Sequence, residues 1–448
     1  MVPTNKQLRR GTLRCLVVAL AVVSAIIAAP TGAVADPAPN ARGVNVVAGI
    51  HDTAINDCNG GGTLQLSTPD VSQLTSAQVA AAGATVASSL FPDGVSTVRV
   101  TMPWDVADPG IVNGSVAADP ATDIQTLNGT RACLDAWLQA VFARGLQPEV
   151  DLRADSNFAD ANGQVRMPSL AQYTRAVTAF RDAYITCSAC ADGGKVKVLA
   201  PWNEPDNQGQ SKVGSQYDLL FPDGQTHLAG TSCPANPTAA DCGAVMAAQM
   251  WVTDYQLIVQ GGCSGCSVPA GDFSGGYGFL TVSGGACPNT CPYTYLYNEN
   301  LVDSSGQQLT PGHWAVHPYY DTKDYQAGTP GDPTRLSQFA DKLHKYGYGS
   351  DTFIWLNEVS VCDTSGPGTC AGTIVNGKTA AMSYLVGDGA SDLTMSVGPA
   401  DPQVGRIDYY CFSGAQSKCN DDWALVVNGA LSPAGQVYAD WAKGSTTS

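Results

Sequence analysis

Basic residues are scarce in this chain. It has 23 lysines and arginines against 39 aspartates and glutamates, which gives a formal net charge of −16. Nucleic acids and anionic membranes are bound by clusters of basic side chains, so this balance argues against both as partners. Charged residues of either sign make up 14% of the sequence, while 44% is hydrophobic. Such a composition is typical of a packed globular chain and not of a disordered one.

Long apolar runs are missing after the first 35 residues, so we expect no membrane-spanning helix in the mature protein. The one such run, at residues 15–29, is too short for a comfortable span and follows a lead with four basic residues. Ala33-Val34-Ala35 has the small-x-small pattern of a cleavage site. Residues 1–35 therefore predict a secretory signal peptide, cleaved before Asp36, in preference to a retained anchor. We expect a secreted, extracellular protein.

Internal repeats, linker-like stretches and a separate binding module are also missing. These absences argue against a structural role at the cell surface. We expect residues 36–42 to form a short leader rich in proline and alanine. Residues 43–448 should form one catalytic domain, which we expect to be a monomer.

The cysteines agree with export. The chain has 15, and an even number remains once Cys15 leaves with the signal peptide. In an oxidising compartment close pairs of cysteines predict disulfides that pin loops, although the sequence does not fix their connectivity. Two C-x-x-C pairs would also suit zinc, but they lie far apart and have no histidine nearby, so we expect no metal. The pairs expected from proximity are Cys187–Cys190, Cys233–Cys242, Cys263–Cys266, Cys287–Cys291, Cys362–Cys370 and Cys411–Cys419, which leaves Cys58 and Cys133 for each other.

Short apolar runs typical of buried strands alternate along the chain with segments of helical spacing. We expect strands at residues 43–48, 96–102, 146–152, 195–201, 267–270, 313–317, 352–357 and 406–412. We expect helices at residues 72–91, 127–144, 169–184, 241–259, 293–301, 333–346, 377–385 and 432–441.

Eight such units in one chain predict an α/β fold, the (β/α)₈ TIM barrel, with long loop insertions pinned by disulfides. The alternative is an open, doubly wound parallel sheet. That fold would place a glycine-rich phosphate turn after its first strand. Gly60-Gly61-Gly62 follows the first predicted strand, but it lacks the G-x-G-x-x-G spacing and no clear helix follows directly. We therefore favour the barrel.

Two predicted strands end in the same way. One apolar run ends in Asn203-Glu204 before a proline, and another ends in Asn357-Glu358. In a TIM barrel the C-terminal ends of the strands line the mouth of the active site, so this pattern predicts a pair of carboxylates there. Further polar and aromatic residues fall at or just beyond other strand ends: Arg99, Asp151, Arg153, His317, Tyr319, Tyr320, Tyr409, Tyr410 and Trp423.

These motifs resemble a known group of enzymes. The segment Trp202-Asn203-Glu204-Pro205, with Glu358 at the end of a later strand, is similar to the retaining glycoside hydrolases of clan A. The segments His317-Pro318-Tyr319 and Val98-Arg99-Val100 resemble the same clan. The resemblance implies a barrel enzyme that acts on a carbohydrate and needs no metal or organic cofactor.

The resemblance also implies a role for each matching residue. Glu204 would be the general acid/base, and Glu358 would be the nucleophile. Asn203 would bind the sugar 2-hydroxyl, and Arg99 would keep the nucleophile ionised.

The remaining candidates surround these four. Tyr319 would orient the nucleophile, and His317 would lie beside the acid or the sugar. Sugar rings present apolar C–H faces that stack on aromatic side chains, and the candidates for this contact are Trp202, Tyr410 and Trp423.

A retaining mechanism needs one carboxylate to attack the anomeric carbon and a second carboxyl group to protonate the leaving oxygen. The two carboxyl groups should lie about 5 to 5.5 Å apart. We therefore expect an O-glycoside hydrolase that cleaves a β-linked polysaccharide or oligosaccharide. A transglycosylase would use the same residues. A carbohydrate-binding barrel without activity is a third interpretation, which the presence of both glutamates argues against.

Each residue also has a purely structural interpretation. Strand-end glutamates can be ion-pair partners, Arg99 could pair with Asp151 in the barrel core, and His317 could be a hydrogen-bonded core histidine. Endo or exo action depends on the shape of the long loops at residues 205–240 and 271–311, which the sequence does not give. One departure from the clan leaves the sugar and the linkage open. Relatives often carry a histidine near the end of the third strand, where this chain has Arg153.

Overall fold

The computed structural model describes residues 46–58, 74–107, 120–154, 168–186, 196–206, 239–275, 293–331, 333–363, 374–387, 392–416, 419 and 421–444. The predicted signal peptide, the leader and the Gly60–Gly62 segment lie outside these residues. So do the Cys187–Cys190 and Cys287–Cys291 pairs, Cys233 and Cys370, and the side chain of Cys242.

Eight parallel strands form one sheet in the order β4-β3-β2-β1-β8-β7-β6-β5. A parallel bridge between Val198 and Ser267 brings the two ends of this order together, and Ser267 N–H donates to the Lys197 carbonyl at 2.8 Å. The sheet is thus nearly closed into a barrel, as predicted. The strands are β1 (Val47–His51), β2 (Thr97–Pro103), β3 (Gln147–Arg153), β4 (Val198–Ala200), β5 (Ala270–Phe273), β6 (His313–Val316), β7 (Phe353–Val359) and β8 (Gln403–Tyr410).

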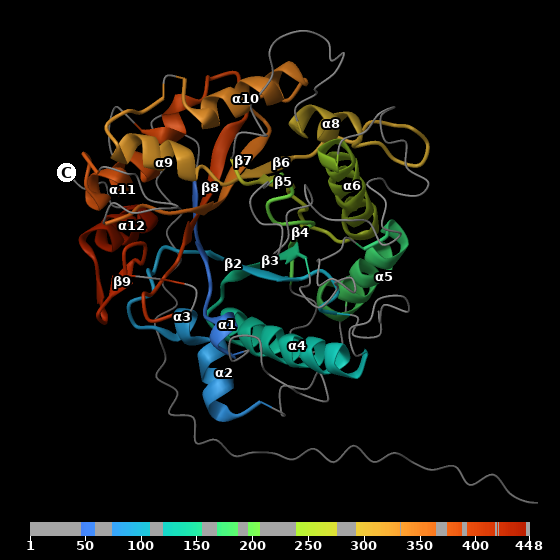
Figure 1. Cartoon of the computed structure of the whole chain (residues 1–448), viewed down its shortest axis with the longest axis horizontal. Helices are drawn as coiled ribbons and strands as arrows, with labels where there is room; N and C mark the ends of the chain where they lie inside the picture. The colour runs from blue at the N-terminus through green and yellow to red at the C-terminus, as the bar shows by residue number, and fades with distance from the viewer. Residues whose placement is uncertain are drawn as a thin grey trace, which may run out of the picture. The chain divides into compact units, whose positions relative to one another are not determined.

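Helices surround the strands, as Figure 1 shows. No helix among the described residues is long and apolar enough to cross a membrane. A hairpin of β9 (Val426–Val427) and β10 (Ala430–Leu431) follows the barrel. The helices are α1 (Ile55–Cys58), α2 (Ser76–Ala82), α3 (Ala84–Ala87), α4 (Pro120–Ala143), α5 (Leu170–Phe180), α6 (Ala239–Asp254), α8 (Tyr293–Glu299), α9 (Tyr319–Gln326), α10 (Arg335–Lys345), α11 (Lys378–Val386) and α12 (Pro433–Ala442).

Local sequence explains where several helices begin. Thr75 and Ser169 each form a capping box with a glutamine three residues later, at the start of α2 and α5. Ser432 caps α12, and Pro433 occupies its first position, as predicted. The single helix predicted at residues 72–91 is wrong, because the helix breaks at Gly83 into α2 and α3. A Cβ on Gly83 would lie 2.8 Å from the Ala140 side chain, so glycine permits close packing against α4.

The strand boundaries differ from the predictions in two places that affect the site. The first strand, predicted to stop at residue 48, continues to His51, because residues 47–51 pair with residues 406–410 of β8. The fifth strand lies at residues 270–273 and not 267–270, and its register shifts at a bulge between Gly271 and Phe273. Local apolar patterns do not reveal which residues a neighbouring strand will pair with. A further helix, α9, was not predicted at all.

A layer of paired charges fills the barrel beneath the strand ends. Arg406 Nη1 lies 2.6 Å from Glu149 Oε2, and its Nε lies 2.8 Å from Asp408 Oδ2. The Asn357 amide donates to Glu149 Oε1 at 2.8 Å. These side chains are buried, so pairing is required to offset their desolvation. A Cβ on Gly49 of β1 would lie 1.6 Å from Asp408 Oδ1, which explains the glycine there.

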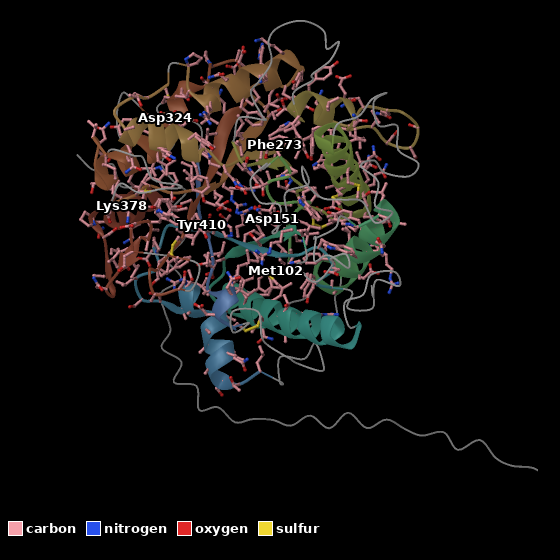
Figure 2. All side chains as sticks on the ribbon, viewed as in Figure 1. Met102, Asp151, Phe273, Asp324, Lys378 and Tyr410 are labelled. Atoms are coloured by element: carbon pink, nitrogen blue, oxygen red, sulfur yellow. A yellow bond between two sulfur atoms is a disulfide. The ribbon has the colours of Figure 1, made fainter. Side chains whose placement is uncertain are left out.

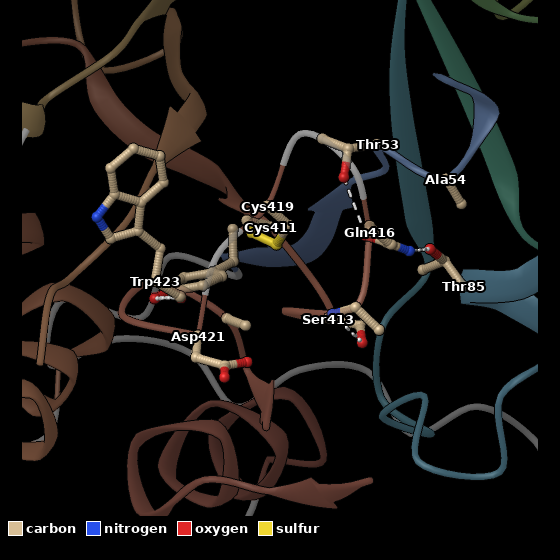
Figure 3. Close-up of a disulfide and its surroundings, with 12 residues drawn as sticks. Thr53, Ala54, Thr85, Cys411, Ser413, Gln416, Cys419, Asp421 and Trp423 are labelled. Atoms are coloured by element: carbon tan, nitrogen blue, oxygen red, sulfur yellow. Dashed lines mark hydrogen bonds between the residues drawn. A yellow bond between two sulfur atoms is a disulfide. The ribbon is translucent and has the colours of Figure 1, made fainter. Parts of the chain in front are cut away.

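Three of the predicted disulfides are present among the described residues. Cys58–Cys133 ties α1 to α4, and Cys263–Cys266 closes a turn before β5. Cys411–Cys419 lies in the loop after β8 (Figure 3). Since Cys263 and Cys266 bond to each other, neither offers a thiolate to zinc.

Candidate active site

The two predicted catalytic carboxylates meet at the C-terminal end of the barrel. Glu204 lies just after β4, while Glu358 lies within β7 and not beyond it. One carboxylate oxygen of each, together with a nitrogen of His317, lie within 4.8 Å of one another. Figure 2 shows Asp151, on β3, labelled within the ring of strands.

Both oxygens of Glu358 are held by donors. Tyr319 donates its hydroxyl to Oε1 at 2.8 Å, and Arg99 Nη1 donates to Oε2 at 3.1 Å. His51 Nδ1 lies 3.0 Å from the same Oε2. Burial alone would raise the pKa of Glu358, but the hydrogen bond and field of His51 and the charges of His317 and Arg99 hold it well below its usual range. Glu358 is therefore ionised at neutral pH.

Arg99 is the hub of the site and is completely buried. Its Nη2 donates to Asp151 at 2.6 Å, to Asn203 at 2.8 Å and to Asp272 at 2.7 Å. The predicted contact with the nucleophile and the alternative pairing with Asp151 both exist, since one guanidinium makes both. Burial would lower the pKa of Arg99, but Asp272 and the other surrounding carboxylates raise it well above its usual value, so it is always charged.

His317 lies between two carboxylates. Its Nδ1 is 3.0 Å from Glu204 Oε1, and its Nε2 is 3.1 Å from Asp272 Oδ1. Burial would lower the pKa of His317, but Asp272 and Glu358, with the hydrogen bonds to Asp272 and Glu204, raise it well above its usual value. The ring is thus an imidazolium that donates at both nitrogens. The structure thus places His317 beside Glu204, the residue predicted to be the acid.

The same group of side chains resembles a metal-binding cluster. Glu204, His317 and Glu358 place one possible ligand atom each within 4.8 Å of the others. A histidine binds metal through an unprotonated nitrogen. Both nitrogens of His317 donate to carboxylates, so its ring does not suit a metal ligand.

His51 was missed by the sequence reasoning, which ended the first strand too early. The register of β1 and β2 pairs His51 with Arg99, so both side chains reach the same level of the barrel. Burial and the charge of Arg99 lower the pKa of His51, and the ring is neutral. Its Nδ1 lies 2.7 Å from Arg99 Nη1 and 3.0 Å from Glu358 Oε2, and its Nε2 lies 3.1 Å from the Thr101 hydroxyl.

Asp272 was also missed, because the fifth strand was predicted three residues too early. Asp272 has a positive φ of 55° at the bulge in β5, and Glu204 has a positive φ of 48°. The Glu204 N–H donates to the Asp272 carbonyl at 3.0 Å, so the two left-handed residues fasten the ends of β4 and β5 together. Non-glycine residues held in this region cluster at functional sites. The sequence does contain one signal for Asp272, since it is a polar residue that follows a glycine, Gly271, near the end of a predicted strand.

The three aromatic candidates have different surroundings. The ring of Tyr410 meets His51 edge to face, with centroids 5.1 Å apart, and lies 6.2 Å from the ring of Trp423. Both side chains are partly exposed. Burial and the charges of Glu358 and Glu204 raise the pKa of Tyr410, so its ring lies close to the two carboxylates. Trp202 is only 2% exposed and packs in the hydrophobic core. It offers no open face to a sugar, which corrects its assignment as a substrate-stacking residue.

The loop that carries Trp423 is tied down from several sides. The Tyr409 hydroxyl donates to the Trp423 carbonyl at 2.7 Å. The buried Lys378 Nζ donates to the Ala424 carbonyl at 2.9 Å and to Asp363 at 3.2 Å. Figure 3 shows Trp423 near the Cys411–Cys419 disulfide of the same loop. Trp423 is therefore held in place by a cation, a tyrosine and a disulfide.

Arg153, where related enzymes often have a histidine, is the last residue of β3 and is partly buried. Burial and the charges of Glu358 and Glu204 raise the pKa of Tyr410, and the positive charge of Arg153 opposes this rise.

Comparison with known proteins gave matches only among solved structures. No family model matches the chain, and no curated protein matches its sequence. A glucosidase from Croceicoccus marinus aligns with 14% identity and a TM-score of 0.45, over 91% of this chain and 69% of that one. A family 39 glycoside hydrolase from Bacteroides cellulosilyticus aligns with 14% identity and a TM-score of 0.45, over 88% and 63%. A β-glucosidase from Thermotoga maritima aligns with 9% identity and a TM-score of 0.47, over 90% and 98%.

These solved structures are of glycoside hydrolases, the class of enzyme that the sequence motifs resemble. The identities and TM-scores are too low to support an assignment of function.

Proposed function

We propose that this protein is a retaining glycoside hydrolase with Glu358 as nucleophile and Glu204 as general acid/base. The observation that carries the proposal is the carboxylate pair, with one oxygen of each glutamate within 4.8 Å of the other. This distance suits direct attack on a sugar better than the wider gap that inverting enzymes need for a water molecule.

The surroundings of the two carboxylates suit opposite roles. Tyr319, Arg99 and His51 hold Glu358 ionised and fixed in orientation, as a nucleophile requires. Glu204 faces the imidazolium of His317 through Oε1. In the proposed mechanism Glu204 serves first as the acid that protonates the glycosidic oxygen and then as the base that activates water.

The substrate that we propose is a β-linked polysaccharide or oligosaccharide. Asn203 is fixed by Arg99, so its amide N–H₂ is oriented to donate to the sugar 2-hydroxyl. Tyr410 and Trp423 lie on the β8 side of the carboxylates, where an apolar sugar face would stack. The β-linkage rests on the motif resemblance alone.

We also propose that the enzyme is exported and works outside the cell as a monomer. The signal-like residues 1–35 and the three disulfides support export. N-terminal sequencing of the protein from a culture supernatant would test it. A mature N-terminus at Asp36 is the expected result, and a protein retained in cells with residues 1–35 intact would contradict it.

The test of the catalytic proposal is mass spectrometry of the intact protein after incubation with a panel of 2-deoxy-2-fluoro glycosides. The fluorine slows the second step, so a retaining enzyme accumulates its glycosyl ester. We expect one glycosyl unit on the wild-type protein, located on Glu358 by peptide mapping, and none on Glu358→Gln. Failure of the panel to label the wild type, together with full activity of Glu358→Gln on a broad set of glycans, would overturn the proposal.

A further inference from the structure

Asp272 has no part in the two-carboxylate mechanism, yet it lies in the middle of the site. It is completely buried, and both of its oxygens contact side chains that touch the catalytic glutamates. Oδ1 lies 3.1 Å from His317 Nε2, and Oδ2 accepts from Arg99 at 2.7 Å. The bulge in β5 turns this side chain inward.

The backbone around Asp272 fixes it in this place. Gly271 has a positive φ of 92°, and its N–H donates to the Tyr297 hydroxyl at 3.1 Å. A Cβ on Gly271 would lie 2.6 Å from the Phe273 ring, so only glycine fits before the bulge. The Asp272 carbonyl in turn accepts from the Glu204 N–H at 3.0 Å. Asp272 thus touches Glu204 through its backbone and His317 through its side chain.

The groups that face His317 come from strands β1 to β5, from β7 and from one helix. Its two direct partners are carboxylates. Burial lowers the pKa of His317, but the charges of Asp272 and Glu358 and the two hydrogen bonds outweigh it. Asp272 itself stays charged, because Arg99 and His317 outweigh its burial and lower its pKa to about 2. The facing groups are His51 on β1, Arg99 on β2, Asp151 on β3, Glu204 after β4, Asp272 on β5, Glu358 on β7 and Tyr319 on α9.

We propose that Asp272 is a positioning residue that keeps His317 protonated at both nitrogens, so that His317 donates to Oε1 of Glu204 and the acid proton of Glu204 resides on Oε2. The inference rests on the proposed glycosidase function and specifies how its general acid is aimed. A carboxyl oxygen that already accepts a charge-assisted hydrogen bond is a poor place for a proton. The charge on His317 therefore leaves Oε2 as the protonated oxygen.

In the first chemical step a Glu358 oxygen forms a bond to the anomeric carbon while the bond from that carbon to the leaving oxygen breaks. The leaving oxygen keeps the electron pair of that bond and takes the proton from Oε2 of Glu204. Glu204 becomes a carboxylate that still accepts from His317, and the two protons of the His317 ring stay where they are.

Removal of the charge on Asp272 should misdirect that proton. In Asp272→Asn the amide oxygen still accepts from Nε2–H, but a neutral ring then presents the Nδ1 lone pair to Glu204. Glu204 would donate its proton to the ring and not to the substrate. Substrates whose leaving groups need protonation should lose the most activity, since general acid catalysis contributes about 10²- to 10⁴-fold to the reaction rate.

Asp151→Asn is a matched control. Asp151 is equally buried and contacts the same Arg99 nitrogen at 2.6 Å, but His317 is not among its hydrogen-bond partners. Each variant replaces a carboxyl group that Arg99 Nη2 contacts with an amide. Only Asp272→Asn removes the negative charge that faces His317 Nε2. A purely structural role of Asp272 through Arg99 would make the two variants behave alike.

The kinetic experiment measures kcat/KM for a series of aryl glycosides, of the sugar that labels Glu358, with leaving groups of increasing pKa. For Asp272→Asn we expect a loss of about 100-fold with the poorest leaving group and only a few-fold loss with dinitrophenol. For Asp151→Asn we expect a similar loss with every leaving group. Equal dependence on the leaving group in the two variants would overturn the proposal.

A second measurement needs no enzymatic activity. The chain has five histidines, so the ring ¹⁵N signals of His317 can be assigned by comparison with His317→Gln. We expect the wild-type ring to remain an imidazolium above pH 7, and to be neutral at pH 7 in Asp272→Asn. A neutral ring in the wild type at pH 7 would overturn the proposal even if Asp272→Asn failed to fold. A charged ring in a protein that no fluoroglycoside labels would instead count against the glycosidase function alone.

Discussion

His51 Nδ1 on β1 lies 3.0 Å from Oε2 of Glu358 on β7. The contact joins two strands that are not neighbours in the sheet, because β8 lies between them. The first strand thus adds a third side chain to the surroundings of Glu358, the proposed nucleophile, beside Arg99 and Tyr319.

Replacement of His51 should change the pH dependence of the reaction. In His51→Ala the nucleophile loses a donor to its charged form, so the pKa of Glu358 should rise and the acid limb of the kcat/KM profile should move to higher pH. We expect kcat/KM at neutral pH to fall about 10-fold, as for loss of a hydrogen bond to a charged group. His51→Asn keeps an N–H near the position of Nδ1 and should restore most of the activity. An unchanged acid limb in His51→Ala would show that His51 has no influence on the nucleophile.

Tyr319 donates its hydroxyl to Oε1 of Glu358, the proposed nucleophile, at 2.8 Å. Tyr319→Phe should lower kcat/KM by about 10- to 100-fold, because a hydrogen bond to a carboxylate contributes about 1.5 to 3 kcal/mol. Tyr325→Phe is the control, since Tyr325 lies on the same helix and stacks on Tyr384, away from the carboxylates. Steady-state kinetics of both variants would check this, with thermal unfolding to confirm that they fold. Equal activity of the two variants would contradict a role for the Tyr319 hydroxyl.

Arg99 should be essential for folding as well as for catalysis. Arg99→Met leaves Asp151 and Asp272 buried without their cation, and removal of one partner from a buried pair costs about 3 to 5 kcal/mol. Arg181→Met is the surface control, because Arg181 pairs with the largely exposed Asp182 and should lose less than about 1 kcal/mol. Urea unfolding of both variants measures the free energies. Equal stabilities would mean that the buried carboxylates take up protons without cost when the guanidinium is absent.

Stability should fall as the pH rises from about 4 to 7, in part because of Asp206. This carboxyl accepts from the Ser274 N–H at 2.7 Å, and its burial raises its pKa to about 7 from an ordinary value of 3.8. The folded state therefore binds more protons than the unfolded state across this range, and the stability that the proton provides is lost as the pH approaches 7.

The variant Asp206→Asn should make the free energy of unfolding less dependent on pH between 4 and 7. Asp341→Asn is the control, because Asp341 is exposed on α10 and pairs with Lys345. Chemical unfolding at intervals of pH would give the slopes. A slope for Asp206→Asn as steep as that of the control would refute the assignment to Asp206.

Lys378 should act on substrate binding and not on the chemical step. Lys378→Met keeps the length of the side chain but removes the donors to Asp363 and to the Ala424 carbonyl, so the Trp423 loop should loosen. We expect KM for oligosaccharides to rise about tenfold, the equivalent of about 1.4 kcal/mol, with a much smaller change in kcat. Lys345→Met removes an exposed lysine from α10 and should leave both constants unchanged. A fall in kcat without a change in KM would mean that Lys378 acts on the chemical step and not on substrate binding.

Much of the architecture could be predicted from the sequence, because parallel strands buried on both faces produce continuous apolar runs. Six of the eight predicted strands share most of their residues with an observed strand or contain it. The first overlaps β1 only at residues 47–48, and the fifth overlaps β5 only at Ala270. Glu204 and Glu358 could be found because each follows such a run directly, next to an asparagine. Asn203, Arg99, His317 and Tyr319 followed from local motifs in the same way.

What the sequence determined by itself was therefore the alternation of strands and helices and the carboxylates that end two of the strands, since both depend on residues adjacent in the chain. Only the tertiary structure decided that His51 and Asp272 join the site and that Trp202 does not. β1 reaches His51 because β8 pairs with it, and Asp272 turns inward because closure between β4 and β5 holds its backbone in the left-handed region. Trp202 is buried by core residues from distant parts of the chain. Pairing, closure and burial depend on neighbours that are remote in sequence, and no local pattern of apolar residues encodes them.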